Sequence, residues 1–337
     1  MFTVTITSHP RQTCAAMTGG IRLRLLLAAI ASLLGLTVCA HAQVPANPCS
    51  LGFVTRLPLN ESTGWFTTAV RINDHPVIML VDTGAAHTAI SPELAKQLRL
   101  PQDRRTRLTV HGVGGNMKAA HPVIAHSFQA GKGHLVDYEL MVANISGPSG
   151  KDKPDAPEGV LGLDLLSYYE LEFDFPNRTL ALYTPSNCSG NFVPWTGRFD
   201  VIAGKRQLDG QLFIPVSVNR QAINAVIDTG ATRTALGIDT AHDVGVSEAE
   251  LRMDRPASTV GANGVPVRTY QHRFDSFTVG QTTFHRVPLF IDDERRGVIQ
   301  MLLGMDFFRR RKLWVSFKTE QIFLQYTPLA HEQHALP

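Results

Sequence analysis

The sequence predicts a mostly β protein made of two homologous lobes in one chain, with few short helices. Its 337 residues, 44% apolar and 18% charged, are enough to build a separate hydrophobic core in each lobe. Residues 81–90 (VDTGAAHTAI) and 227–236 (IDTGATRTAL) are identical at six of ten positions. A repeat of this length, preceded in each half by similar β-forming runs, indicates an internal duplication.

The β-forming runs come in pairs before each copy of the repeated segment. In the first half they read FTTAVRI and VIMLV, and in the second half LFIPVSV and INAVI. Short polar turns at residues 73–75 and 219–221 separate the two members of each pair, which predicts two β-hairpins. Each half therefore begins with a hairpin that leads into the repeated segment.

A second motif also occurs once in each half. It reads VLGLD at residues 160–164 and LLGMD at residues 302–306. Gly162 lies 80 residues after Asp82, and Gly304 lies 76 residues after Asp228. Alternating strands ending in tyrosine follow at residues 179–183 and 321–326. Two different motifs at nearly equal spacing make a chance repeat untenable.

Glycine-containing stretches and helix signals complete the pattern. Residues 111–116 and 260–265 are flanked by β-forming residues, which predicts a hairpin tip in each half. Ser91 followed by Pro92 predicts the start of a helix, and a shorter helix is expected at residues 239–244, ending at Gly245. Asp164 and Asp306 precede short segments of helical character and are interpreted as helix caps.

The expected organisation is a first lobe, a link and a second lobe between two terminal segments. We assign residues 1–42 to a signal peptide, 43–186 to the first lobe, 187–208 to a linker, 209–327 to the second lobe and 328–337 to a tail.

The first segment reads as a secretory signal. Two arginines precede fourteen uncharged residues (25–38), and Ala40-His41-Ala42 provides a cleavage site after Ala42. Fourteen residues are too few to span a bilayer, and Val38 before Cys39 is bulkier than a lipid-attachment site accepts. We expect a secreted or periplasmic protein without a stable membrane anchor after cleavage, and Met17 is an alternative start.

Cysteines and charge restrict the chemistry further. Cleavage leaves Cys49 and Cys188, and such a pair in an oxidising compartment predicts a disulfide bond. We expect no metal site, because neither a Cys-x-x-Cys motif nor zinc-type histidine spacing is present. Residues 43–337 carry 29 basic and 29 acidic residues, which argues against a nucleic-acid partner.

Asp82 and Asp228 are the candidate catalytic residues. Each follows a run of apolar β-forming residues, where an unpaired carboxylate is costly to bury. Two lobes related by a pseudo-two-fold axis would bring the acids together, so that they share one proton. Such a pair can activate a water molecule and protonate a peptide carbonyl without a metal or cofactor. The alternative is a pair of capped turns with no chemistry.

These motifs resemble those of the aspartic peptidases, in particular the retropepsin-like group with secreted bacterial members. The resemblance covers about residues 65–183 and 211–326. It implies two β-barrel lobes, catalytic roles for Asp82 and Asp228, and interlocking of Thr83 with Thr229. It also implies that the dyad turns contain Gly84 and Gly230, and that substrate-covering flaps contain glycines of the two tips: Gly112, Gly114, Gly115, Gly261 and Gly264.

Two features set the chain apart from pepsin-like members. Ala85 and Ala231 follow the Asp-Thr-Gly triplets, whereas pepsin-like members usually have serine or threonine at this position. Neither tip contains tyrosine, which one flap of pepsin-like members carries. Without a hydroxyl group near each carboxylate, the carboxyl pKa values are lowered less than in pepsin-like members. We therefore predict an activity optimum that is only mildly acidic. His87 and Arg233 occupy equivalent places near the dyad, either as solvated loop residues or as specificity determinants.

The sequence therefore predicts a monomeric aspartic endopeptidase that acts on peptides or proteins. Two alternatives remain open: a peptide-binding module of the same fold without activity, and pairing of the first lobe with that of a second chain. Thr88 and Thr234 are expected to satisfy backbone groups, and the basic run at residues 309–312 to be a solvated helix end.

Overall fold

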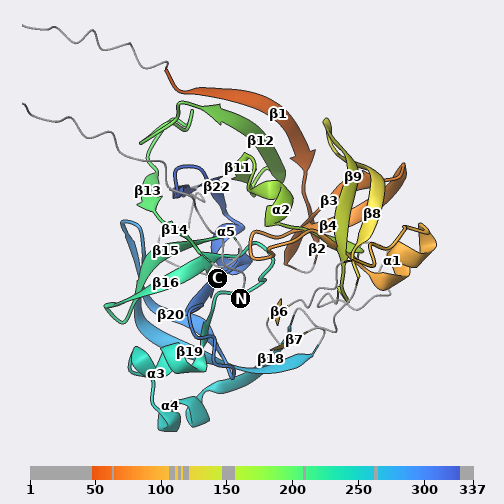
Figure 1. Cartoon of the computed structure of the whole chain (residues 1–337). Helices are drawn as coiled ribbons and strands as arrows, with labels where there is room; N and C mark the ends of the chain where they lie inside the picture. Colours follow the sequence, from red (N-terminus) through yellow and green to blue (C-terminus); the bar gives the residue numbers. More distant parts are fainter. Residues whose placement is uncertain are drawn as a thin grey trace, which may run out of the picture. The chain divides into compact units, whose positions relative to one another are not determined.

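The computed structural model confirms a mostly β architecture with two barrel-like sheets (Figure 1). The structure describes residues 48–62, 64–105, 111–112, 115–116, 121–145, 156–207, 210–261 and 265–326. The expected signal peptide and tail lie outside these residues. Within the described residues, no helix is long and apolar enough to span a bilayer.

The first lobe contains a seven-stranded sheet. The β3–β4 hairpin turns at Asn73 and Asp74, where the backbone adopts positive φ angles as predicted for a tight turn. β10 pairs with β4 in parallel and with β5 in antiparallel, so it joins the hairpin to the rest of the sheet. In sheet order the strands are β2 (Asn60–Ser62), β3 (Trp65–Ile72), β4 (His75–Val81), β10 (Gly159–Leu161), β5 (Ala89–Ile90), β9 (Gly133–Val142) and β8 (Val123–Ala130).

The second lobe repeats this plan in an eight-stranded sheet. Its first hairpin turns at Asn219 and Arg220, again at positive φ angles, and β21 pairs with β16 as β10 pairs with β4. In sheet order the strands are β14 (Lys205–Gln207), β15 (Gln211–Val218), β16 (Gln221–Ile227), β21 (Met301–Leu303), β17 (Ala235–Gly237), β20 (Thr282–Asp292), β19 (Pro266–Val279) and β18 (Arg255–Val260).

A third, six-stranded sheet contains strands from both halves of the chain. The central pair is β11 of the first half and β22 of the second, with Glu172 opposite Trp314 and Asp174 opposite Lys312. In order the strands are β1 (Ser50–Pro58), β12 (Thr179–Ser186), β11 (Glu170–Asp174), β22 (Arg311–Ser316), β23 (Gln321–Tyr326) and β13 (Asp200–Ala203), and β1 runs beside β12 in Figure 1. This sheet joins the halves through backbone hydrogen bonds.

Buried side chains reinforce the junction. Glu170 on β11 accepts hydrogen bonds from Trp314 Nε1 (2.7 Å) and Ser316 Oγ (2.8 Å) on β22. Burial raises the pKa of Glu170, while these two donors oppose the rise. The rings of Phe175 and Phe308, one from each half, lie 6.5 Å apart. The halves thus share a core as well as a sheet.

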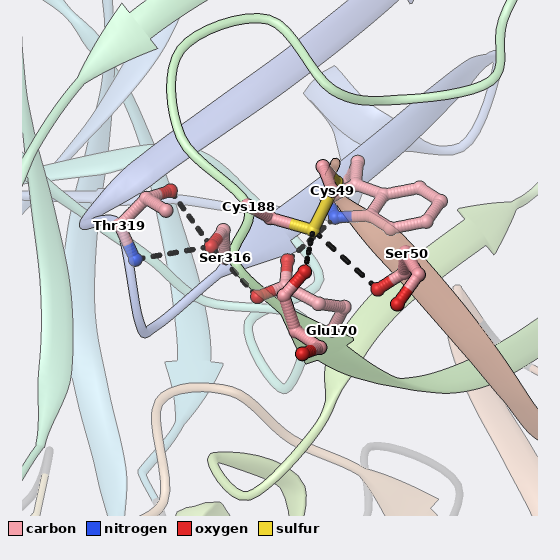
Figure 2. The surroundings of a disulfide bond; sticks show 8 residues. Cys49, Ser50, Glu170, Cys188, Ser316 and Thr319 are labelled. Carbon is pink, nitrogen blue, oxygen red and sulfur yellow. Dashed lines mark hydrogen bonds between the residues drawn. A yellow bond between two sulfur atoms is a disulfide. The ribbon is translucent and has the colours of Figure 1, made fainter. Parts of the chain in front are cut away.

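The predicted disulfide joins Cys49 and Cys188 across 139 residues of sequence. Figure 2 shows it beside Glu170 and Ser316, near the place where the two halves meet. It ties the beginning of β1 to the chain just after β12, the strand with which β1 pairs. A disulfide is consistent with folding in an oxidising compartment.

The helices are few and short in the described residues. Ser91 Oγ accepts a hydrogen bond from Leu94 N–H (3.1 Å), which confirms the predicted cap, and Gly245 ends the second predicted helix region at a φ angle of 98°. The helices are α1 (Pro92–Gln97), α2 (Leu163–Leu166), α3 (Ile238–Asp243), α4 (Glu248–Met253) and α5 (Met305–Phe308).

The range expected to be a linker, residues 187–208, contains β13 and β14, which add strands to two sheets. Asp200 and Ile202 of β13 are buried. The polar composition of the flanking residues gave no indication of this burial.

The basic run at residues 309–312 is not simply a solvated helix end. The Arg311 side chain is buried, donates to the carbonyl oxygen of Phe307 and lies 4.2 Å from the centre of that residue's ring. Lys312 forms ion pairs with Glu172 (3.3 Å) and Asp174 (3.7 Å) across the six-stranded sheet. The guanidinium group of Arg311 also lies near the rings of Phe284 and Tyr326, which are distant in sequence, as are the acids that pair with Lys312.

Candidate active site

The two Asp-Thr-Gly loops begin where β4 and β16 end. The backbone N–H of Asp82 donates to the carbonyl oxygen of Leu161, and that of Asp228 to the carbonyl oxygen of Leu303, each at 3.1 Å. These bonds continue the parallel pairing with β10 and β21. Both aspartates are therefore placed by the same short parallel strand pair, once in each lobe.

Thr83 and Thr229 connect the two loops. The backbone N–H of each donates to the hydroxyl of the other, at 3.0 Å and 3.1 Å. Each hydroxyl in turn donates to a carbonyl oxygen of the opposite lobe, Thr83 to Ile227 (2.6 Å) and Thr229 to Val81 (2.8 Å). Both side chains are about 1% exposed. The loops are thus locked to each other by four reciprocal hydrogen bonds.

Gly84 and Gly230 allow the loops to approach closely. A Cβ atom on Gly84 would lie 2.6 Å from Asp228 Oδ1, and one on Gly230 would overlap the Asp82 carboxyl group. Each glycine therefore packs against the aspartate of the opposite lobe, and a side chain at either position would displace a carboxyl group.

The carboxyl groups of Asp82 and Asp228 lie close to each other, since each packs against the glycine of the opposite loop and each affects the pKa of the other. Each also accepts two backbone N–H bonds from its own loop. Asp82 Oδ1 accepts from Gly84 (2.7 Å) and Ala85 (3.1 Å). Asp228 Oδ1 has the matching donors Gly230 (3.0 Å) and Ala231 (2.9 Å). The sequence prediction that the two acids meet agrees with this geometry.

Both acids have raised pKa values. Burial, followed by the negative charge of Asp228, raises the pKa of Asp82 to about 8. Burial also raises the pKa of Asp228, while its backbone donors and the charge of Arg296 oppose the rise. The pair can therefore hold one proton beside one negative charge, which is the arrangement that combines an acid with a base.

A second layer of hydrogen bonds supports each loop. Asp164 Oδ1 accepts from the backbone N–H (2.8 Å) and hydroxyl (2.6 Å) of Thr88, whose hydroxyl oxygen accepts from Gly162 N–H (3.1 Å). In the second lobe Asp306 and Thr234 make the same two bonds at the same distances. The prediction that these threonines satisfy backbone groups is confirmed.

The interpretation of Asp164 and Asp306 as helix caps is wrong. The N-caps of α2 and α5 are Gly162 and Gly304, without a side-chain cap bond. The aspartates instead accept bonds from the chain beyond the dyad loops, because the loop and the helix lie together in space. The recurrence of the Thr and Asp pair in both halves was the signal available in the sequence.

The proposed flap residues are described only in part. Gly112 and Gly115 pair with each other across the short hairpin of β6 (His111–Gly112) and β7 (Gly115–Asn116). The backbone N–H of Gly261 donates to the carbonyl oxygen of Val265 at 2.9 Å. Gly114 and Gly264 lie outside the described residues. Both predicted tips thus contain hairpin-type backbone pairing.

Sequence reasoning missed two contributors to the site. Gln211 Nε2 donates to the carbonyl oxygen of Gly84 and so adds another bond between the lobes. Arg296 places a positive charge within reach of Asp228. Both contacts arise from tertiary structure, and no local motif marks either residue. Within the described part of the chain, no cluster of three or more metal-binding side chains is present.

Comparison with known proteins agrees with this geometry. A sequence model of the family described as aspartyl protease matches residues 68–165 and 214–307, one match in each lobe. The chain belongs to the retropepsin-like aspartyl proteases, with two copies of the family domain. A search of curated proteins found no match.

Proposed function

We propose that the protein is an aspartic endopeptidase with one active site, formed within a single chain by Asp82 and Asp228. The observation that carries this proposal is the close approach of the two carboxyl groups at the junction of the lobes, where each packs against the glycine of the opposite loop. Membership of the aspartyl protease family supports hydrolysis of peptide bonds.

We assign the neutral role to Asp82, whose pKa is raised to about 8, and the ionised role to Asp228. Asp228 as the carboxylate takes a proton from a water molecule while the water oxygen attacks the peptide carbon. Asp82 as the neutral acid donates its proton to the carbonyl oxygen, so that a neutral gem-diol forms. Asp228 then passes the proton that it received to the leaving nitrogen as the C–N bond breaks, and Asp82 regains its proton from the diol. Atoms and charge balance without a metal, a cofactor or a covalent enzyme intermediate.

The reciprocal bonds of Thr83 and Thr229 have a role in this chemistry. A peptide lying between the lobes would press on both loops, and the four hydrogen bonds hold the carboxyl groups in fixed positions. We further propose that the protein acts as a monomer outside the cytoplasm, in the secreted or periplasmic space. The disulfide supports that location.

Cleavage of a broad peptide library between pH 3 and 8 tests the proposal. Wild-type protein is expected to cleave, and Asp82→Asn and Asp228→Asn are each expected to abolish cleavage while peptide binding persists. A statine-type transition-state mimic is expected to inhibit, because its hydroxyl group replaces the attacking water. Absence of cleavage by the wild type, with peptide binding retained, would show a peptide-binding module instead.

Mixing the two inactive variants tests whether the site lies within one chain. If Asp82 and Asp228 of one chain form the site, an equimolar mixture of Asp82→Asn and Asp228→Asn stays inactive. If first lobes of two chains paired instead, Asp228→Asn alone would keep its activity. Light scattering of the active wild type is expected to give the mass of a monomer.

A further inference from the structure

The two sides of the dyad are related by sequence but differ in charge. In the first lobe Ala89 of β5 pairs with Met141 of β9, and in the second lobe Ala235 of β17 pairs with Phe290 of β20. Met141 and Phe290 are therefore equivalent positions. His87 and Arg233 are equivalent as well, because each lies five residues after its aspartate.

The second-lobe side contains a charged cluster. The guanidinium group of Arg233 lies 4.4 Å from the centre of the Phe290 ring, and the Arg233 side chain is exposed. Two residues after Phe290, Asp292 is buried and ion-paired to Arg296, whose side chain is only 7% exposed. The charges of Arg233 and Glu294 also act on Asp292. Asp292 is thus a buried carboxylate that is ion-paired to Arg296 and influenced by the charge of Arg233.

The first-lobe side is apolar at the corresponding positions. Met141 packs with Ala89 and Ala143 in a small buried cluster, and Ala143 takes the place of Asp292. His87 is exposed, as Arg233 is. Among the described residues, the two sides therefore differ at the strand positions next to these exposed residues.

The charged cluster lies on the sheet face that leads to the second flap. Thr269 of β19 is opposite Asp292, so their side chains project from the same face. Val267, two residues further toward the tip, shares that face, and the predicted tip begins beyond Pro266. The side of the sheet against which Arg233 rests therefore continues toward the flap that would cover a bound peptide.

Donor groups in this cluster lack acceptors. Among the described residues, Arg296 Nε and Thr269 Oγ1 are buried and have no hydrogen-bond partner. Buried donors of this kind are rare because leaving them unpaired is unfavourable.

We propose that Arg233, supported by Arg296, is a specificity-determining residue that binds an acidic side chain of the peptide substrate on the second-lobe side of the cleaved bond. A carboxylate placed over Phe290 can accept two hydrogen bonds from the planar guanidinium group of Arg233. Because Met141 and Ala143 of the first lobe stand where Phe290 and Asp292 stand in the second, the two directions of a bound peptide are not equivalent. This inference rests on the proposed endopeptidase function and adds the substrate class.

Matched peptides test the inference. Each position within three residues of the cleaved bond is occupied in turn by Glu, Gln or Lys, and kcat and KM are measured separately. The wild type is expected to prefer Glu over Gln at one position on one side of the bond by about tenfold in kcat/KM, mainly through KM. Arg233→Met keeps contact with Phe290 but removes the charge, so this preference is expected to disappear.

Two further variants make the result specific. Arg233→Glu is expected to reverse the preference, with Lys favoured over Gln at the same position. Arg252→Met, on the outer helix α4, is expected to keep the wild-type preference. Equal cleavage of Glu, Gln and Lys peptides by the wild type, or an unchanged preference in Arg233→Met, would overturn the inference and leave the endopeptidase proposal intact. Failure of the wild type to cleave any peptide would overturn both.

Discussion

Thr83 and Thr229 each donate a backbone N–H to the hydroxyl group of the other, although 146 residues separate them in the sequence. Each hydroxyl also donates to a carbonyl oxygen of the opposite lobe. The relationship is symmetric, and it involves buried atoms that have lost their contact with water. The position of one dyad loop is therefore determined by the other.

Replacing Thr229 with valine is expected to disturb both loops. The change keeps the shape of the side chain but removes one donor and one acceptor, leaving Thr83 N–H and the Val81 carbonyl oxygen unpaired. We expect a loss of about 2–4 kcal/mol in the free energy of unfolding, measured by urea denaturation. Thr229→Ser keeps the hydroxyl and serves as the control. Equal stability of the two variants would contradict the role of these bonds.

The pH dependence of cleavage follows from the dyad. Activity requires one proton on the pair, and Asp82, with its pKa raised to about 8, retains that proton up to near-neutral pH. We expect kcat/KM to fall above about pH 8 as Asp82 ionises, and to fall in acid as Asp228 becomes protonated. Initial rates on one peptide between pH 3 and 10 measure both limbs. A rate that still rises below pH 3 would contradict this assignment.

The same pair predicts a pH dependence of stability. The folded-state pKa of Asp82 lies above its ordinary value, so its contribution to stability is complete below about pH 4 and is lost as pH rises through about 8. Asp82→Asn removes the like-charge pair. The melting temperature of this variant is therefore expected to fall less between pH 6 and 9 than that of the wild type. With like-charge repulsion on the order of 1–4 kcal/mol, the difference is several degrees.

A surface substitution provides the control for that measurement. Asp243→Asn changes the same functional group at an exposed position of α3. Its melting curve is expected to follow that of the wild type at every pH. If Asp82→Asn also follows the wild type, the two carboxyl groups are not coupled.

Much of this architecture could be predicted because the same motifs occur once in each half of the sequence. The hairpin turns, the Asp-Thr-Gly loops and the helix that starts after Ser91 depend on local residues, and the duplicated spacing indicated that Asp82 and Asp228 meet. The contact of Gln211 with Gly84 and the proximity of Arg296 to Asp228 could not be predicted, since these partners come from other parts of the chain. The strands within residues 187–207 were missed because their pairing partners are non-local and their flanks are polar.

Removal of the disulfide is expected to lower stability while the fold is retained. The bond between Cys49 and Cys188 closes a loop spanning 139 residues, for which the chain-entropy model gives at most about 5 kcal/mol. The double variant Cys49→Ser/Cys188→Ser is expected to unfold at lower urea concentration than oxidised wild type, with β1 still paired to β12. Reduced wild type should match the variant, and a difference between them would point to an effect of the substitutions themselves.

The pairing of β11 with β22 has a consequence for how the protein is made. Residues 171–174 cannot form this pairing until residues 312–315 have been synthesised, about 140 residues later. The six-stranded sheet that joins the two halves can therefore be completed only when translation is nearly finished. Under the proposed function, cleavage activity is expected only after the second half has folded against the first.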